Sequence, residues 1–88
     1  MDADVNLGNV LFREGRNEEA ADRYRAALAL NPRLAEVHNN LGVLLAQVGR
    51  LSEAEAEFEA AVRLKPGYRE ARDNLERARR AAGDLARP

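Results

Sequence analysis

Residues 6–20 read NLGNVLFREGRNEEA, and residues 40–54 read NLGVLLAQVGRLSEA. The two stretches belong to copies of one unit, because a shift of 34 positions aligns twelve identical residues between residues 1–34 and 35–68. A partial third copy begins at Asn74 and Leu75 and has Gly83 in the same frame. A unit of this length cannot bury its apolar face alone and has to stack on its neighbours. The sequence therefore predicts a solenoid.

Apolar residues recur at helical spacing within each unit, and the breaks between them predict five helices. We expect these helices over residues 3–14, 18–30, 34–48, 52–65 and 68–82. Asp2 and Asn17 are candidate starts of the first two helices, and Ser52 with Glu55 has the spacing of a capping box at the fourth. Gly15, Gly49 and Gly83 are expected to end the first, third and fifth helices, and Asn31 with Pro32 the second. Such short connections leave room only for antiparallel helix pairs, so the fold class is all-α.

Small residues predict where the two helices of a pair come close. Gly8 with Ala20, and Gly42 with Ala54, lack the bulk that holds helix axes apart. The space around this contact is expected to be filled by Leu7, Leu11, Tyr24 and Leu28, and in the second unit by Leu41, Leu45, Phe58 and Val62.

The series Leu7, Gly8, Leu11, Ala20, Tyr24, Ala27 and Pro32, repeated as Leu41, Gly42, Leu45, Ala54, Phe58, Ala61 and Pro66, resembles the tetratricopeptide repeat. The family's Trp position holds Asp4 and His38, and its Tyr position holds Leu11 and Leu45. The resemblance implies a right-handed α-solenoid of antiparallel helix pairs. It divides one domain into a first repeat at 1–34, a second at 35–68, a capping helix at 69–83 and a short tail at 84–88.

The fifth helix carries charge where a further repeat would need contact residues. Glu76 and Arg79 stand where the earlier units have Gly8 and Leu11. Its apolar stripe is narrow, comprising Ala71, Leu75, Ala78 and Ala82. This pattern is typical of a terminal cap with one buried face. Its arginines are interpreted as a solvated face rather than a nucleic-acid or acidic-partner site.

Composition argues against several classes of function. The formal net charge is -1, with 14 basic and 15 acidic residues, which does not favour nucleic acid as a partner. Cysteine is absent, so disulfides and thiolate chemistry are excluded. No apolar run approaches the roughly 20 residues that span a bilayer, and Asp2 and Asp4 follow Met1 in place of a basic leader. We expect a cytoplasmic protein without membrane contact.

No catalytic or metal-binding pattern is present. His38 is the single histidine, and we interpret it as structural rather than as a metal ligand or proton-transfer group. The acidic series Glu53, Glu55, Glu57 and Glu59 cannot converge on a cation, because alternate residues of a helix point about 200° apart. The chain is expected to be non-enzymatic, with no cofactor and no metal.

The resemblance to the repeat family implies a concave groove lined by the first helix of each unit. The candidate peptide-binding residues, called the groove residues below, are Val5, Asn6, Asn9, Phe12, Arg13, Glu36, Asn39, Asn40, Val43, Gln47, Asn74 and Arg77. Asp2 and Ala46 occupy equivalent positions. Asn6, Asn40 and Asn74 form a ladder that could grip a peptide backbone, or could only link neighbouring helices, and both interpretations stay open. Phe12 is either an anchor for a partner or part of the packing, with packing favoured.

The family's carboxylate clamp for chaperone tails is expected to be absent. Asn9 and Asn40 match its two asparagines, but Val5, Glu70 and Asn74 stand where its cations belong. The leading hypothesis is a protein–protein interaction module that receives a peptide or helix in its groove. The alternative is a self-assembling scaffold that uses the open solenoid ends, or an excised or designed fragment. We expect a monomer or a weak homo-oligomer whose partner is a protein or peptide.

Overall fold

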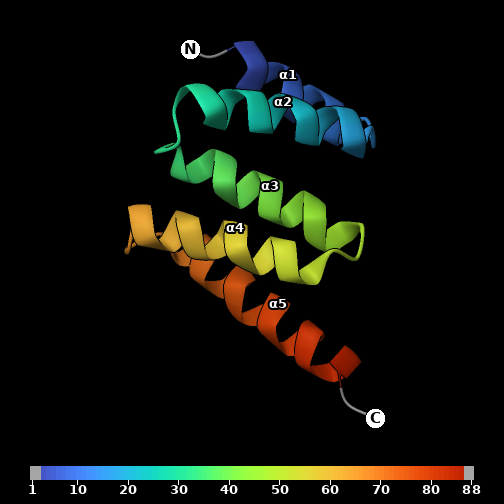
Figure 1. The fold of residues 1–88 in the computed structure, drawn as a ribbon, viewed down its shortest axis with the longest axis vertical. Helices are drawn as coiled ribbons and strands as arrows, with labels where there is room; N and C mark the ends of the chain where they lie inside the picture. The colour runs from blue at the N-terminus through green and yellow to red at the C-terminus, as the bar shows by residue number, and fades with distance from the viewer. Residues whose placement is uncertain (1–2, 87–88) are drawn as a thin grey trace.

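The computed structural model describes residues 3–86, and this part of the chain is built from five helices without a strand. The helices are α1 (Ala3–Arg13), α2 (Asn17–Leu30), α3 (Ala35–Gln47), α4 (Leu51–Leu64) and α5 (Arg69–Ala86). They stack in chain order along the long axis, and α5 runs obliquely below α4 toward the C-terminus (Figure 1). The prediction of an all-α solenoid of helix pairs is confirmed.

Glycines end α1 and α3 as expected. Gly15 and Gly49 have φ angles of +79° and +85°, in the left-handed region that glycine adopts at least cost. The amide of Arg16 donates to the Leu11 carbonyl at 2.9 Å, and the amide of Arg50 donates to Leu45 at 2.9 Å. These bonds, together with those of the glycine amides, satisfy carbonyls that the helix leaves free. The chain therefore reverses at once into the second helix of each pair.

The starts of α2 and α4 differ from the expected ones. The residues that precede α2 and α4 are Arg16 and Arg50, and neither helix start has a side-chain cap. Asn17 and Ser52 lie inside the first turns instead, so the capping box at Ser52 does not form. The residue at each N-cap position is an arginine, whose guanidinium has only donors and cannot accept a hydrogen bond from the free helix amides. The proposed cap Asp2 lies outside the described residues.

α5 continues through Gly83 to Ala86 instead of ending at Gly83. Gly83 does not have a positive φ angle, and nothing lies within 4 Å of the place where its Cβ would be. A glycine ends α1 and α3 because the chain has to turn back and pack the next helix. Within residues 3–86 no helix follows α5, so no packing contact in this part of the chain requires a turn at Gly83.

At the seam inside each helix pair, the side chain nearest to the glycine of the first helix is an aromatic ring of the second helix. A Cβ on Gly8 would lie 2.7 Å from Cε1 of Tyr24, and a Cβ on Gly42 would lie 2.5 Å from Cε1 of Phe58. Such distances lie well inside ordinary carbon–carbon contact. Ala20 and Ala54 are nonetheless fully buried, as their small size predicted. The ring of the second helix therefore occupies the space that the glycine leaves.

The two ends of the stack differ in how much apolar surface they expose. On α5, Ala71, Leu75 and Ala78 are buried against the stack, while Glu76 and Arg79 are exposed, which is the burial pattern expected of a capping helix. On α1, Leu7 is 41% exposed and Val10 is 42% exposed. Leu7 was predicted to fill the space inside the helix pair but is exposed, whereas its equivalent in the second repeat, Leu41, is 1% exposed. The N-terminal face of α1 has no helix over it in residues 3–86.

Candidate functional site

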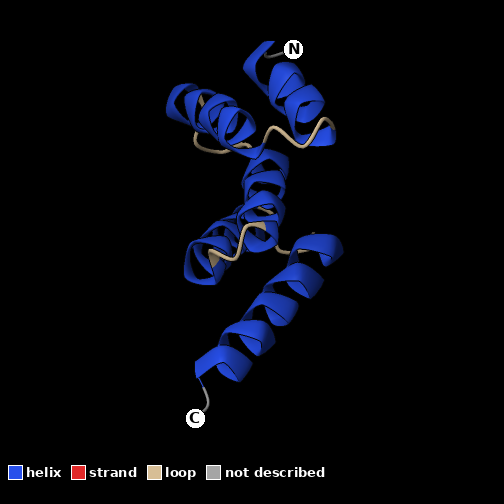
Figure 2. Cartoon of the chain, turned by 90° about the vertical axis from the view of Figure 1, so that its right-hand side faces the viewer, coloured by secondary structure: helices blue, strands red, loops and turns tan. Residues whose placement is uncertain are grey.

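The groove residues lie on α1, α3 and α5, the first helices of the successive units. Figure 2 shows α2 and α4 on one side of the stack and α1 with the start of α5 on the other. Asn6, Arg13, Glu36, Gln47 and Arg77 are exposed. Val5, Asn9, Phe12, Asn40, Val43 and Asn74 are half-buried. Asn39 is 2% exposed, so this groove residue is part of the core rather than of the surface.

A cluster of polar groups joins α1, α2 and α3. The hydroxyl of Tyr24 donates to Oδ1 of Asn9 at 2.6 Å, and the amide of Asn40 donates to the same oxygen at 3.3 Å. Burial raises the pKa of Tyr24 above its ordinary value, while the Asn40 amide and the Arg13 charge act in the opposite direction. The phenol therefore stays neutral and serves as a donor. This bond was not predicted, since the repeat pattern reads Tyr24 only as an aromatic core residue.

A second cluster joins α3 and α5. The amide of Asn74 donates to Oδ1 of Asn39 at 3.0 Å, and the amide of Asn39 reaches Glu70 at 3.5 Å. Asn40 and Asn74 thus each link two successive first helices, which is the structural interpretation of the asparagine ladder. Each amide uses one hydrogen in these bonds, and a primary amide has two donors and two acceptor sites. The half-buried amides therefore keep hydrogen-bonding capacity.

Phe12 is half-buried and packs against the hydrophobic core, as the packing interpretation predicted. Its counterpart in the second repeat is Ala46, which also contacts the core but is much smaller. An apolar pocket of about 330 Å³ opens between α3, α4 and α5 beside Ala46. The residues lining it are Val43, Ala46, Gln47, Leu51, Phe58, Asn74, Arg77, Ala78 and Ala81. Four of the groove residues therefore meet at one hollow.

The N-terminal edge of the groove is acidic and partly paired. Lys65 donates to Glu36 at 3.2 Å, and its ammonium lies 5.0 Å from the centre of the Tyr68 ring. The pKa of Glu36 is lowered, first by a hydrogen bond from its own backbone amide and then by Lys65. Burial raises the pKa of Tyr68, and the charges of Glu70 and Glu36 add to the effect. This edge presents carboxylates, whereas Arg13 is the last residue of α1 and Arg77 lies near the middle of α5.

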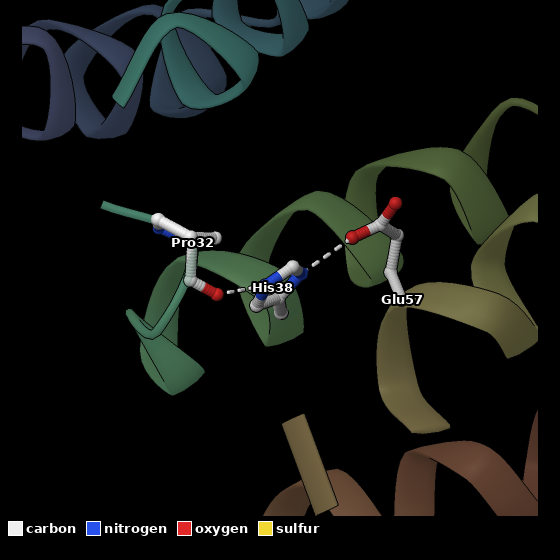
Figure 3. Close-up of polar contacts among 3 residues, drawn as sticks. All are labelled: Pro32, His38 and Glu57. Atoms are coloured by element: carbon white, nitrogen blue, oxygen red, sulfur yellow. Dashed lines mark hydrogen bonds and ion pairs between the residues drawn. The ribbon is translucent and has the colours of Figure 1, made fainter. Parts of the chain in front are cut away.

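His38 has a structural environment. Nδ1 lies 2.8 Å from a carboxylate oxygen of Glu57 on α4, and Nε2 lies 2.9 Å from the carbonyl oxygen of Pro32 (Figure 3). The carbonyl can only accept, so Nε2 is the donor in that bond. The ring therefore ties the loop before α3 to α4. Asp4 and Arg23, the equivalent pair of the first repeat, also meet, with 3.5 Å between Oδ1 and Nη1.

The acidic series on α4 is divided among different partners. Glu57 contacts His38, Glu53 lies 3.9 Å from Arg50, and Glu55 and Glu59 both contact Arg79 of the cap. Within the described part of the chain, no three His, Cys, Asp or Glu side chains gather in a way that could hold a metal ion. In the same residues no helix is long and apolar enough to cross a membrane.

Two stacked helix pairs with a polar final helix define a helical-repeat protein. The family model described as TPR repeat matches residues 8–49, and the model described as tetratricopeptide repeat matches residues 35–68. The chain belongs to the tetratricopeptide repeat family, as the residues at the seam and the loops predicted.

Solved structures of this family superpose closely on the chain. The second TPR domain of Spaghetti (RPAP3), bound to the HSP90 peptide SRMEEVD, is 26% identical with a TM-score of 0.89, over 94% of this chain and 77% of that one. The first domain, bound to the same peptide, is 26% identical with a TM-score of 0.86, over 93% and 67%. MamA is 27% identical with a TM-score of 0.89 over 92% of this chain, which spans about half of MamA, at 47%. No curated protein sequence matches the chain.

Proposed function

We propose that this chain is a non-catalytic interaction module whose groove receives a peptide segment of another protein. The observation that carries the proposal is the set of half-buried polar side chains on successive first helices, next to an apolar pocket. Amides with spare donors and acceptors suit an extended peptide backbone, and the pocket suits a side chain. Two structural neighbours bind a peptide, which supports the same use here.

The peptide is expected to differ from the chaperone tail that those neighbours bind. At the three positions where the clamp of the family has cations, this chain has Val5, Glu70 and Asn74. Asn74 already donates to Asn39, and Glu70 would repel a terminal carboxylate. The groove therefore selects a ligand by other contacts.

Amide chemical-shift mapping tests the proposal. The probe is a twelve-residue peptide selected against the folded chain from a random displayed library, with SRMEEVD as a second probe. We expect the selected peptide to shift amides around Asn6, Asn40 and Asn74, and SRMEEVD to bind far more weakly. Shifts confined to α2 and α4, or failure of every selected peptide to bind in solution, would contradict a groove function. Micromolar binding of SRMEEVD would contradict the absence of a clamp.

A matched pair of variants separates groove contacts from general charge effects. Arg13→Gln removes a cation from the groove side of α1, and Arg25→Gln removes one from the exposed surface of α2. We expect only the first to weaken the selected peptide, by about twofold to fivefold at low salt. Equal effects of the two variants would indicate non-specific charge attraction.

Self-association is a second candidate, favoured by the exposed Leu7 and Val10 on α1. The arginines of α5 give it less support, because Arg79 is paired with Glu55 and Glu59, and Arg80 with Glu76. Association through an apolar face persists at high salt, whereas association through arginines is screened. Sedimentation over a concentration series at two salt concentrations distinguishes them, and a constant monomer mass would remove this candidate.

A further inference from the structure

The apolar pocket exists because the second repeat lacks a side chain that the first repeat has. A shift of 34 positions aligns Phe12 with Ala46, and Phe12 packs against the core cluster in the first repeat. In the second repeat the corresponding space is part of the 330 Å³ pocket. The apolar part of the pocket wall that comes from the cap is small, because it consists of Ala78 and Ala81. The space therefore lies open at the surface of the groove rather than filled by the protein itself.

Six of the nine lining residues are apolar, and they include the buried ring of Phe58. The volume is close to the lower limit of about 300 Å³ for ligand sites. It accommodates one large side chain and is too small for a helix, whose diameter is about 10 Å. The interior of the pocket therefore favours a single aliphatic or aromatic side chain.

The polar residues of the pocket are Gln47, Asn74 and Arg77. Arg77 is exposed and makes no ion pair within residues 3–86, in contrast to Arg79 and Arg80 on the same helix. No carboxylate lines the pocket. A guanidinium beside an apolar hollow favours a ligand that carries an anionic group next to its apolar one.

We propose that this pocket binds a peptide through one large apolar side chain, with an adjacent Asp or Glu held by Arg77. The proposal rests on the proposed function, because it assigns the side-chain preference of the same groove. Gln47 and Asn74 supply neutral hydrogen-bonding groups toward the peptide backbone. The acidic residue need not be at a C-terminus, which distinguishes this recognition from a carboxylate clamp.

Three blocked peptides in a Gly/Ser background test the preference: one with a central Leu-Glu, one with Ser-Glu and one with Leu-Lys. Their ends are acetylated and amidated, so no terminal carboxylate is present. We expect Leu-Glu to bind about tenfold or more tightly than Ser-Glu, which loses the buried side chain. We expect Leu-Lys to bind more weakly than Leu-Glu by a factor that shrinks with added salt.

Two variants locate the effect. Ala46→Phe is compatible with the fold, because the first repeat carries phenylalanine at the same position. It should fill the pocket, abolish the difference between Leu-Glu and Ser-Glu, and leave the thermal midpoint unchanged or higher. Arg77→Gln should abolish the difference between Leu-Glu and Leu-Lys, and Arg72→Gln, on the same helix but away from the pocket, should not.

The outcomes separate this inference from the proposed function. If library-selected peptides bind the groove but Ala46→Phe leaves Leu-Glu affinity unchanged, the pocket assignment is wrong and the groove function stands. If Arg77→Gln and Arg72→Gln have the same effect, the assignment of the acidic contact is wrong. If no peptide binds the wild-type chain at all, both proposals are contradicted.

Discussion

At the level of single residues, the two repeats differ at one pair of equivalent positions, which is polar in the first repeat and apolar in the second. Tyr24 and Asn9 are joined by a hydrogen bond of 2.6 Å in the first repeat. A shift of 34 positions turns them into Phe58 and Val43. A buried hydroxyl requires a partner, while a phenyl ring requires none. Each pair therefore leaves no buried polar group without a partner. Combining the tyrosine of one pair with the valine of the other is expected to destabilise the fold.

A double-mutant cycle tests this pairing. Tyr24→Phe removes a donor from Asn9 and should cost about 1 kcal/mol, and Asn9→Val should cost about 1 to 3 kcal/mol because it leaves the Tyr24 hydroxyl unpaired. The double variant reproduces the pair of the second repeat, so it should be more stable than the sum predicts by about 0.5 to 1.5 kcal/mol. Urea unfolding of the four proteins gives the coupling. Additive costs would show that the bond contributes nothing specific.

Two glycines of this chain are expected to respond in opposite directions to substitution by alanine, because one lies in a tight contact and the other in open space. Alanine at Gly42 would place Cβ 2.5 Å from the Phe58 ring, which is packed in the core, so we expect a loss of about 1 to 3 kcal/mol. Alanine at Gly83 meets nothing within 4 Å and replaces a glycine inside α5. That change should stabilise the helix by about 0.5 to 1 kcal/mol. Thermal unfolding of the two variants checks both signs, and a harmless Gly42→Ala would contradict the tight seam.

At the level of helices, α1 and α3 have the same register but different neighbours. Leu41 on α3 is 1% exposed, and its equivalent Leu7 on α1 is 41% exposed. Leu44 and Val10 show the same contrast, at 2% and 42%. The difference comes from position in the stack, because α3 has a repeat in front of it and α1 has none within residues 3–86.

The substitutions Leu41→Ala and Leu7→Ala are a matched pair for this effect. The first creates a cavity in the core and should cost about 2 to 5 kcal/mol, while the second should cost less than about 1 kcal/mol. Urea unfolding at low protein concentration measures both. Comparable costs would mean that the face of α1 is covered in solution, and the unfolding midpoint would then depend on protein concentration.

The helices themselves were predictable from the sequence, because the 34-residue spacing and the helical periodicity agree. Their ends were less so. Ser52 has the spacing of a capping residue, yet the turn at Gly49 starts α4 at Leu51, and Gly83 has no left-handed turn to make. A local motif shows that a residue is able to cap or end a helix. Whether the helix starts or ends there depends on the path that packing against the neighbouring helix imposes on the chain.

The sequence predicted which helices carry the candidate site residues, but not which of their side chains contact one another. The repeat frame placed Val43, Gln47, Asn74 and Arg77 on the expected helices, and these four line one pocket. Burial of Asn39 was not predictable from the periodicity. It depends on Asn74 and Glu70, which come from a helix 31 or more residues further along the chain. Predicting which side chains pair between helices of the stack requires the distance between those helices. The spacing of residues within one helix gives no information on that distance.

At the level of the whole molecule, the stack is about 43 Å long and 18 Å thick, so much of each helix lies near an end or a surface. Burial is concentrated in the middle. α3 has seven buried residues, whereas α1 has two among its described residues. In a solenoid each unit is stabilised mainly by its nearest neighbours. Stability should therefore fall from the centre toward both ends.

Native-state hydrogen exchange tests this gradient amide by amide. We expect the slowest exchange in α3 and α4, which are packed on both sides, and faster exchange in α1 and in the last turn of α5, around Gly83. Gly83→Ala should slow exchange in that last turn while leaving α1 unchanged, because within residues 3–86 the other helices of the stack separate α1 from α5 (Figure 1). Equal protection in all five helices would instead indicate a single all-or-none unit. In that case the ends could not open independently, and α1 would be a rigid face rather than a loosely held one.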